Sequence, residues 1–447
     1  MSVGRGAVLS RRSAVARPCE RRPCSGEPSA ALERRRRGGG ARCCAAASNG
    51  EEQPREHEGK SPLYLVRSDG FVCSRESVEG GLLRFDAPTT EQIKLFWIKP
   101  PQRVLVLKKR GSELLPELKE MVSFLHGEEG MDVVVEPEDA RLLAGQGVTH
   151  VETFDPHRVD EGLEDLSARI DFVVCLGGDG VILHASQLFP KAVPPVLAFS
   201  LGSLGFLTTH TFEEHREAIR AVKYGASSNG ETSGGGAAAA TDGAEGGLEA
   251  NGINVSLRMR LRCEILRGGE PIPGKQYQVL NEVVLNRGVA PYLSLIECYE
   301  KNRLLTKVQA DGVMLATATG STAYSVAAGG SMVHPNVPAI LFTPVCPHSL
   351  SFRPVILPDS AELELRIPAE ARTQGWASFD GQHQQRLRRG DSVKVTMSAH
   401  PLPTINRRAE TGDWFSSLSR CLNWNERKEQ SPFLPGLEAP PHHHRVE

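Results

Sequence analysis

A carboxylate in a glycine-rich turn is the first group in the sequence that could do chemistry. The motif Gly177-Gly178-Asp179-Gly180 follows an apolar run at 170–176 that is typical of a buried strand, and a helix is expected to start near Val181. Such a turn points backbone N–H groups at phosphate oxygens. Because a carboxylate repels phosphate, we expect Asp179 to hold a cation or to accept a proton from an alcohol that attacks a phosphate. A helix cap is the structural alternative.

Two polar residues interrupt a second apolar run. Asn281 and Glu282 lie side by side within the strand-like stretch 277–286. Neighbouring residues of a strand point to opposite faces, and buried polar groups need partners. We therefore expect at least one of the two to meet a ligand or an internal partner. A purely structural role remains the alternative.

A third polar stretch begins at Asp311 and ends in hydroxyl-rich residues at 317–325. Hydroxyls and exposed amides suit ribose hydroxyls, phosphates or a nicotinamide carboxamide, and Asp311 could accept hydrogen bonds from a sugar diol. A Ser/Thr-rich turn that caps a helix at 323–329 is the alternative. The nearby sequence Phe379-Asp380-Gly381-Gln382 indicates, taken alone, only an ordinary turn.

The elements that must position these residues fall into two groups. In the first, a helix at 112–125 with Ser112 as its cap separates strand-like runs at 103–108, 131–135, 170–176 and 195–199. This alternation predicts a parallel α/β sheet, with ligands beyond the carboxyl ends of its strands. Only short irregular elements are expected at 61–100.

The second group is β-rich. Short, often alternating runs separated by turn residues occur at 255–266, 277–286, 293–299, 304–308, 312–316, 363–367 and 392–396. They predict a sandwich-like domain or packed sheets.

Composition limits the possible functions. Residues 1–50 hold eleven Arg, no Lys and three Glu, a net charge of +8, so the remaining residues carry −10 of the total of −2. This argues against a general nucleic-acid binder, and the absence of an apolar run of 18 residues argues against a membrane span. The ten cysteines form no zinc-like CxxC pair; Cys175 and Cys263 are expected to be buried thiols in a reducing compartment.

The chain is expected to divide into seven segments. The Arg-rich, acid-poor leader at 1–50 has the composition of an organelle transit peptide, and residues 42–47 (RCCAAA) resemble plastid cleavage sites. Chloroplast import is the hypothesis, with mitochondrion, cytoplasm or a disordered basic leader as alternatives. The other segments are a linker (51–94), the α/β domain (95–224), a disordered insertion (225–252), the β-rich domain (253–400), a segment returning to the α/β domain (401–428) and a disordered tail (429–447).

Taken together, the motifs at 176–180, 281–282, 311–312 and 319–324 resemble, in order and spacing, those of the NAD kinase family. The connecting sequence at 202–208, 277–284 and 334–354 is similar to its eukaryotic branch, and the resemblance covers about 95–428. It implies an α/β N-terminal domain, a β-rich C-terminal domain and NAD between them. It also implies a C-terminal segment that returns to the first domain, which would suit residues 413–424 as a docking amphipathic helix; a loose surface helix is the alternative. It also implies transfer of the ATP γ-phosphoryl group, with Mg²⁺, to the 2′-hydroxyl of the adenosine ribose of NAD.

The resemblance also implies residue roles. Asp179 matches the catalytic aspartate, which would accept the proton of the hydroxyl as a general base. Residues that would contact NAD or ATP are Gly177, Gly178, Gly180, Phe206, Asn281, Glu282, Asp311, Thr319, Gly320, Ser321, Thr322, Ala323, Tyr324, Ser325, Cys346 and Gln382. No metal ligand is assigned. A homo-oligomer is expected, without nucleic-acid or membrane partners.

Three positions depart from the family pattern. Val181 stands where Thr, Ser or Asn is common, and Ala316 and Ala318 replace the usual Ser and Pro. These changes put rate and affinity in question more than substrate identity. Two other hypotheses remain: a lipid kinase with the same Gly-Gly-Asp-Gly turn, which leaves the C-terminal motifs unexplained, and an NAD(P)-binding protein without catalysis.

Overall fold

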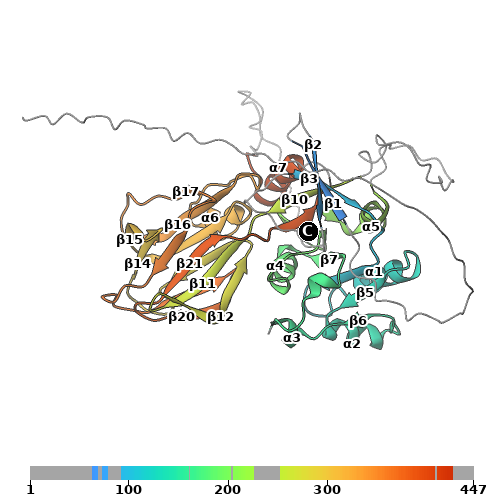
Figure 1. Cartoon of the computed structure of the whole chain (residues 1–447), viewed down its shortest axis with the longest axis horizontal. Helices are drawn as coiled ribbons and strands as arrows, with labels where there is room; N and C mark the ends of the chain where they lie inside the picture. The colour runs from blue at the N-terminus through green and yellow to red at the C-terminus, as the bar shows by residue number, and fades with distance from the viewer. Residues whose placement is uncertain are drawn as a thin grey trace, which may run out of the picture. The chain divides into compact units, whose positions relative to one another are not determined.

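The computed structural model describes residues 63–68, 73–78, 92–160, 162–202, 205–225, 252–407 and 410–425 (Figure 1). The expected leader, most of the expected insertion and the expected tail lie outside these residues. No described helix is long and apolar enough to cross a membrane.

The first sheet has a parallel centre. Its strands follow the spatial order β22, β8, β7, β4, β5, β6, and each neighbouring pair is parallel. This confirms the predicted parallel α/β sheet and its strands to within about two residues. The bounds are β4 (Arg103–Lys108), β5 (Asp132–Val135), β6 (Glu152–Thr153), β7 (Phe172–Gly177), β8 (Val196–Ser200) and β22 (Leu402–Ile405), with β9 (His210–Thr211) beside β8.

Helices connect these strands and pack on the sheet (Figure 1). They are α1 (Leu115–Gly127), α2 (Pro137–Gly145), α3 (Pro156–Asp160), α4 (Asp179–Leu188) and α5 (His215–Tyr224). The expected cap at Ser112 is wrong, because α1 begins after Leu114, which caps it without a side-chain hydrogen bond. The expected helix start near Val181 lies two residues earlier, at Asp179.

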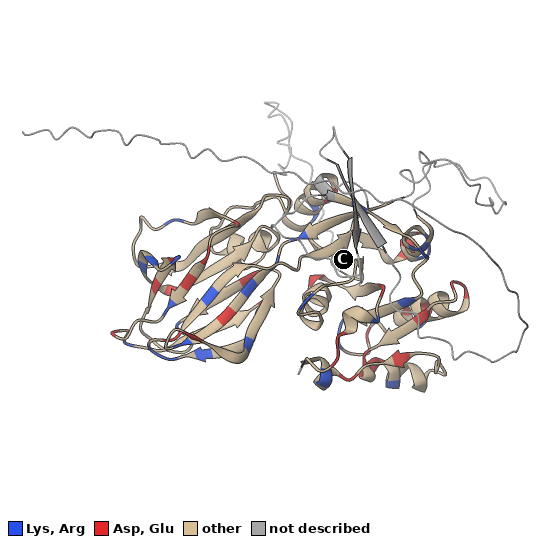
Figure 2. Cartoon of the chain, viewed as in Figure 1, with Lys and Arg blue, Asp and Glu red and all other residues tan. Residues whose placement is uncertain are grey.

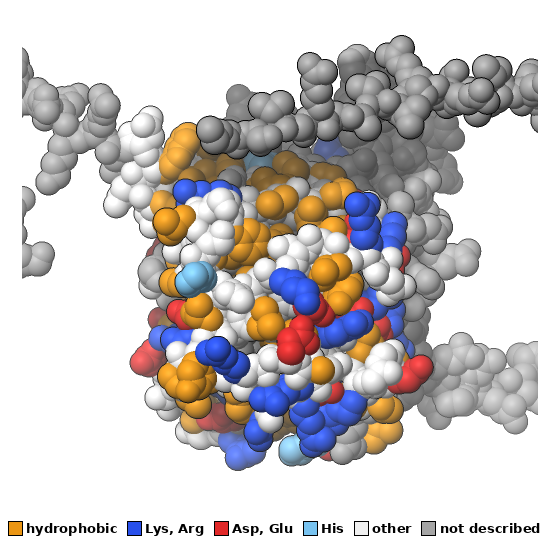
Figure 3. Space-filling view, turned by 90° about the vertical axis from the view of Figure 1, so that its left-hand side faces the viewer, with side chains coloured by type: hydrophobic (Ala, Val, Ile, Leu, Met, Phe, Trp, Pro, Cys, Tyr) orange, Lys and Arg blue, Asp and Glu red, His pale blue; other side chains and the backbone are white. Residues whose placement is uncertain are grey.

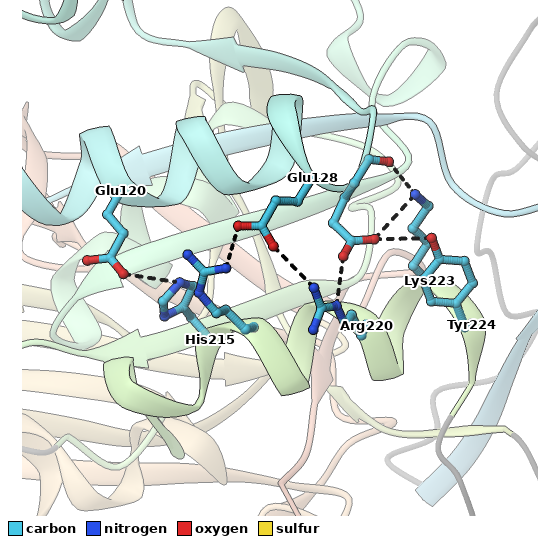
Figure 4. A network of polar contacts seen from close by, with 8 residues as sticks. Glu120, Glu128, His215, Arg220, Lys223 and Tyr224 are labelled. Atoms are coloured by element: carbon cyan, nitrogen blue, oxygen red, sulfur yellow. Dashed lines mark hydrogen bonds and ion pairs between the residues drawn. The ribbon is translucent and has the colours of Figure 1, made fainter. Parts of the chain in front are cut away.

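Charged side chains tie α5 to α1 (Figure 4). Glu129 is 7% exposed and accepts a hydrogen bond from Arg220 at 2.8 Å and one from the Tyr224 hydroxyl at 3.1 Å. Glu128 pairs with Arg216 and Arg220 at 2.5 and 3.2 Å. Figure 2 shows both signs of charge on the helices of this domain. The network fixes the last described helix before the inserted segment.

Antiparallel strands extend the first sheet. β1 (Leu63–Ser68), β2 (Cys73–Val78) and β3 (Gln92–Trp97) join it through β10 (Ile253–Arg258), which pairs with both β3 and β22. The expectation of irregular structure at 61–100 is therefore wrong. β1 pairs with its neighbours β2 and β3, and only β3 pairs with β10, more than 150 residues later. A local pattern carries no information about that distant partner.

The second sheet is antiparallel and curls around an apolar interior. Its order is β12, β11, β21, β18, β14, β15, β13, β19, β20, with β16 on β15 and β17 on β16. The bounds are β11 (Leu261–Arg267), β12 (Glu270–Val279), β13 (Glu282–Asn286), β14 (Ser294–Glu300), β15 (Arg303–Thr317), β16 (Ala339–Pro347), β17 (Val355–Pro358), β18 (Leu363–Arg366), β19 (Gly375–Phe379), β20 (Gln382–Leu387) and β21 (Ser392–Met397). The β-rich second domain is thereby confirmed.

Two strand boundaries differ from the sequence expectation. The run 255–266 is two strands, β10 and β11, which lie in different sheets and separate at Met259–Arg260. The run 277–286 breaks at Leu280–Asn281, between β12 and β13. The Arg260 side chain at the first break and the Leu280 and Asn281 amides at the second bond to residues far away in the sequence. Hydrophobic periodicity does not reveal such partners.

Three apolar clusters hold the fold together. One covers each face of the first sheet, and the third fills the curled second sheet. Cys175 and Cys263 are buried free thiols, as predicted. Val181 is 6% exposed and belongs to the cluster around α4, so its side chain faces the core and not the open end of the turn. Ala316 and Ala318 pack in a small cluster with Val333 and Leu341.

Candidate active site

Asp179 lies at the carboxyl end of β7, as the first residue of α4. Its carboxylate accepts hydrogen bonds from the backbone N–H of Phe206 at 2.9 Å and of Leu207 at 3.0 Å. The structure thus brings together the predicted residues Asp179 and Phe206. A carboxylate has about four lone-pair positions, so each oxygen can still accept a second hydrogen bond from a ligand.

Gly205 makes this arrangement possible. A Cβ atom at position 205 would lie 1.9 Å from Oδ1 of Asp179 and 2.4 Å from its Cγ. Any other side chain would therefore push the carboxylate or the loop aside. The only sequence signal for this role was the Leu-Gly-Ser-Leu-Gly-Phe-Leu motif at 201–207.

The corner between β12 and β13 carries Asn281 and Glu282. Asp380, from the turn between β19 and β20, accepts hydrogen bonds from the amides of Leu280, Asn281 and Glu282 at 2.8, 2.7 and 3.2 Å. Asp380 is 6% exposed and has a φ of 49°. No local pattern singles out this residue, since an Asp-Gly pair is common in turns.

The hydroxyl-rich stretch lies against the same corner. Thr317 donates its hydroxyl to the Leu280 carbonyl at 2.6 Å and its amide to the Asn281 carbonyl at 2.9 Å. A Cβ atom at Gly320 would lie 2.2 Å from the Asn281 carbonyl oxygen, so only glycine allows this approach. The predicted residues at 319–323 therefore lie beside Asn281. They include a 3₁₀ turn (Thr319–Thr322), which precedes α6 (Tyr324–Ala327).

The hydroxyls of this stretch have different surroundings. Ser321 is buried and exchanges hydrogen bonds with the Val333 backbone, and Ser325 is buried and bonds to Thr343 at 2.9 Å. These two side chains shape the loop from inside. The Thr319 hydroxyl is buried without a hydrogen-bond partner in the described structure, and Tyr324 is 45% exposed.

Asp311 lies on β15, outside this corner. It pairs with Arg287 at 2.6 Å. Both line a cavity of about 500 Å³ that also contains Tyr324 and Trp376. Cys346 is exposed and lies next to Asp311, because the flanking pairs are Ala310–Pro347 and Gly312–Val345.

Gln382 lines a larger cavity of about 1150 Å³. The cavity lies along α4 and beyond the carboxyl ends of β4 and β5. Several cationic side chains line it, namely Lys108, Arg110, Arg141, Lys191, Arg262 and Lys275. Lys108 is buried and bonds to Asp139 at 2.8 Å. Glu136, Glu138 and Asp139 also line the cavity, so six cationic side chains face three acidic ones. Its size and net positive charge suit a polyanionic ligand.

Burial perturbs the acids of the corner. Burial and the charge of Asp380 raise the pKa of Glu282 to about 7, and Oε2 of Glu282 is buried without a hydrogen-bond partner in the described structure. Burial also raises the pKa of Asp380 to about 6, against the effect of its three backbone hydrogen bonds. The Glu282 carboxylate also accepts a backbone hydrogen bond from Tyr324, and its buried Oε2 is an atom that a bound ligand could satisfy.

Apolar packing joins the Asp179 turn to the corner. Leu280 is fully buried in the same cluster as Val181, Ile182 and Leu207. Helix α4 also contacts β12. The two sides of the candidate site therefore share one core.

The last described helix, α7 (Glu410–Leu422), confirms the helix expected near 413–424. Trp414 contacts the ring of His334 at 5.0 Å. Burial, and after it the charge of Asp179, raises the pKa of the Cys421 thiol. The charge of Asp179 therefore affects the pKa of a thiol at the end of α7.

Among the described residues, no cluster of three or more His, Cys, Asp and Glu side chains could hold a metal ion. Mg²⁺ does not require one, because it is commonly held by one or two carboxylates together with nucleotide phosphates.

Comparisons with known proteins show the family to which this chain belongs. The ATP-NAD kinase N-terminal domain matches residues 103–226, and the ATP-NAD kinase C-terminal domain matches residues 280–407. A crystal structure of yeast NADH kinase complexed with NADH is similar, with 31% identity and a TM-score of 0.63, over 78% of this chain and 95% of that one. The chain belongs to the NAD kinase family.

Plant members of the NAD kinase family are more similar in sequence. "Probable NAD kinase 2, chloroplastic" of Oryza sativa subsp. japonica is 57% identical over 372 residues, and "NAD kinase 2, chloroplastic" of Arabidopsis thaliana is 56% identical over 372 residues. Each match covers 83% of this chain and 35% of the relative, so the chain spans about a third of the length of these relatives. Membership of the NAD kinase family removes the support for a lipid kinase.

Proposed function

We propose that this chain is an ATP-dependent NAD kinase, which transfers the γ-phosphoryl group of ATP to the 2′-hydroxyl of the adenosine ribose of NAD. The supporting observation is that one apolar core joins the Asp179 turn to the Asn281–Glu282 corner, in a chain of the NAD kinase family. This shared core supports the proposal that a base and a polar binding corner act together in one site.

NAD would lie across the corner. Asn281, Glu282 and the loop at 319–323 would hold its adenosine end, with the free carboxylate oxygen of Glu282 accepting from a ribose hydroxyl. The cavity with Asp311 and Tyr324 would take the nicotinamide side. Ser321 and Ser325 would act indirectly, through the shape of the loop.

ATP would occupy the larger cavity along α4. Its cationic side chains would neutralise the triphosphate, and Gln382 would contact it from the β-rich domain. Mg²⁺ would enter with the nucleotide, where it neutralises charge on the phosphates during transfer. We assign no protein ligand to the metal.

Asp179 would act as the general base. A secondary hydroxyl is a poor nucleophile at neutral pH, and a positioned base contributes about 10²–10⁴-fold to such a reaction. The two loop amides fix the carboxylate in place while leaving a lone pair on each oxygen.

The test is NADP formation by the purified chain with NAD, ATP and Mg²⁺, alongside Asp179→Asn. We expect the parent to form NADP and the variant to lose about 10²–10⁴-fold in kcat, with the Kd for NAD changed less than about tenfold in calorimetry. The side-chain amide oxygen of the variant can still accept one of the two loop bonds. NAD binding without NADP formation by the parent would instead establish a binding protein.

Two further proposals concern the whole protein. The relatives from rice and Arabidopsis are named chloroplastic, which supports a chloroplast location for this chain. We also propose that the chain assembles with copies of itself, through the apolar sheet edge at β17.

A further inference from the structure

Arg260 is a fully buried arginine at the point where the chain passes from the first sheet to the second. Its guanidinium donates to the carbonyls of Ser186 and Phe189 at 2.9 Å each and of Lys191 at 2.6 Å, and its Nε donates to the His400 carbonyl at 2.7 Å. Ser186 belongs to the last turn of α4, and Phe189 is its C-cap. Arg260 therefore satisfies carbonyls at the end of the helix that begins with Asp179.

Asp380 holds the backbone of the corner between β12 and β13, as Arg260 holds the end of α4. Its two carboxylate oxygens accept three consecutive amides, which define the corner with Asn281 and Glu282. An aspartate buried in this way fixes backbone geometry, because each lost bond would leave an amide buried without a partner.

The two residues are neighbours in the fold. Leu261 pairs with Val279 across β11 and β12, so Arg260 and Leu280 are the next positions beyond that pair. The Leu280 amide donates to Asp380. The two side chains also affect each other's pKa. Burial lowers the pKa of Arg260 to about 9, and the negative charge of Asp380 reduces this lowering. Burial raises the pKa of Asp380, and the positive charge of Arg260 reduces that rise.

We propose that Arg260 and Asp380 are positioning residues for the phosphoryl transfer. Arg260 fixes the helix that begins with Asp179, and Asp380 fixes the corner that carries Asn281 and Glu282. The buried pair thereby sets the distance between the base and the bound NAD. This inference rests on the proposed function and deepens it.

The experiment measures kcat, the Kd for NAD without ATP, and amide hydrogen exchange on the full chain. For Asp380→Asn we expect the Kd for NAD to rise at least tenfold. The NH₂ group of the new asparagine would replace a carboxylate oxygen and face backbone N–H donors. For Arg260→Met we expect kcat to fall at least tenfold with the Kd for NAD within threefold. Arg260→Lys keeps the positive charge but lacks the planar guanidinium, which donates to several carbonyls at once. Its kcat should therefore lie between those of the parent and Arg260→Met.

Two other buried residues are matched controls, one in the β-rich domain and one two positions before Arg260. Asp391 is 3% exposed and accepts an Arg388 amide and the Arg267 side chain in the β-rich domain; Arg258 is 5% exposed and donates to Thr404 in the first sheet. We expect Asp391→Asn and Arg258→Met to lower Tm while changing kcat and the Kd for NAD less than twofold. The double variant Arg260→Met with Asp380→Asn should lose less kcat/KM than the product of the single losses.

Variants of Arg260 and Asp380 that lower Tm but match the controls in kcat and Kd would overturn the proposal. A parent that forms no NADP would overturn the proposed function instead. In that case, hydrogen exchange alone tests whether Arg260 and Asp380 position the backbone. Exchange should rise at 280–282 in Asp380→Asn and at 186–191 in Arg260→Lys, and unchanged exchange at both segments would contradict it.

Discussion

At the scale of single residues, Asp179 serves two purposes in this structure. Its carboxylate holds the loop that follows β8, and in the proposed reaction the same carboxylate takes a proton. The loop bonds restrict the side chain to one orientation, so the base needs little reorganisation when the hydroxyl arrives. Loss of the loop geometry should then affect turnover even when the carboxylate itself is kept.

Gly205→Ala tests this point. The new Cβ would overlap the Asp179 carboxylate, so we expect the loop to move, both hydrogen bonds to weaken and kcat to fall at least 100-fold. Steady-state kinetics measures the change. Gly145→Ala is the control, because a Cβ there meets nothing within 4 Å, and it should keep kcat within twofold. A normal kcat in Gly205→Ala would show that the loop does not position Asp179.

The buried acid Glu282 predicts a dependence of stability on pH. Its pKa is about 7 in the folded chain, against about 4.3 when unfolded, so the folded state binds more protons between these values. Stability should therefore fall as the pH rises from about 4.5 to about 7, and stay lower above that. The contribution of Glu282 to this loss is about 4 kcal/mol.

Urea unfolding of the parent and of Glu282→Gln from pH 5 to pH 8 measures this effect. The glutamine side chain cannot ionise, so the free energy of unfolding of the variant should decrease less than that of the parent from pH 5 to pH 8. Glu297→Gln is the control. Hydrogen bonding to Lys307 lowers the pKa of Glu297, so removal of this carboxylate should leave the decrease in stability between pH 5 and pH 8 as large as in the parent. Equal pH dependence in the parent and Glu282→Gln would contradict the prediction.

At the scale of elements, we expect α7 to support the candidate site, although it is the last described helix. Leu418 is 1% exposed, whereas Leu422 on the same helix is 42% exposed. We expect Leu418→Asp to detach α7, because a charge cannot be buried without a partner. Since the helix ends near Asp179, kcat should then fall at least tenfold.

Limited proteolysis and kinetics check this prediction, with Leu422→Asp as the matched control. The control adds the same charge at an exposed position and should leave cleavage and kcat unchanged. Faster cleavage of Leu418→Asp with an unchanged kcat would show that α7 is only a structural attachment.

Local sequence patterns predicted the elements whose own residues decide their structure. The buried strands β4, β5, β7 and β8 have continuous apolar runs, whereas the helix near 413–424 was expected from the family resemblance. The corner at Leu280–Asn281 could not be found in this way, because the acid that forms it is Asp380, a hundred residues later. For the same reason Gly205, Arg260 and Asp380 were missed as site residues: each acts through a contact between distant segments.

At the scale of the whole molecule, the β-rich domain presents apolar side chains at one edge of its sheet. β17 pairs only with β16 among the described strands, and Val355 and Ile356 on it are 48% and 51% exposed. Leu350, just before it, is 88% exposed. Figure 3 shows hydrophobic side chains gathered in the upper part of this face. An unpaired, apolar edge strand is a ready surface for another chain.

We expect a second copy of the chain to cover this edge, in line with the proposed homo-oligomer. Val355→Glu together with Ile356→Lys would place charges in that interface and should shift the mass in solution toward the 48.6 kDa monomer. Light scattering coupled to size exclusion measures the shift. Leu163→Glu changes an exposed apolar residue (65% exposed) of the first domain and should leave the mass unchanged. An oligomer that keeps its mass in the double variant would place the interface elsewhere, because two buried charges at its centre could not be tolerated.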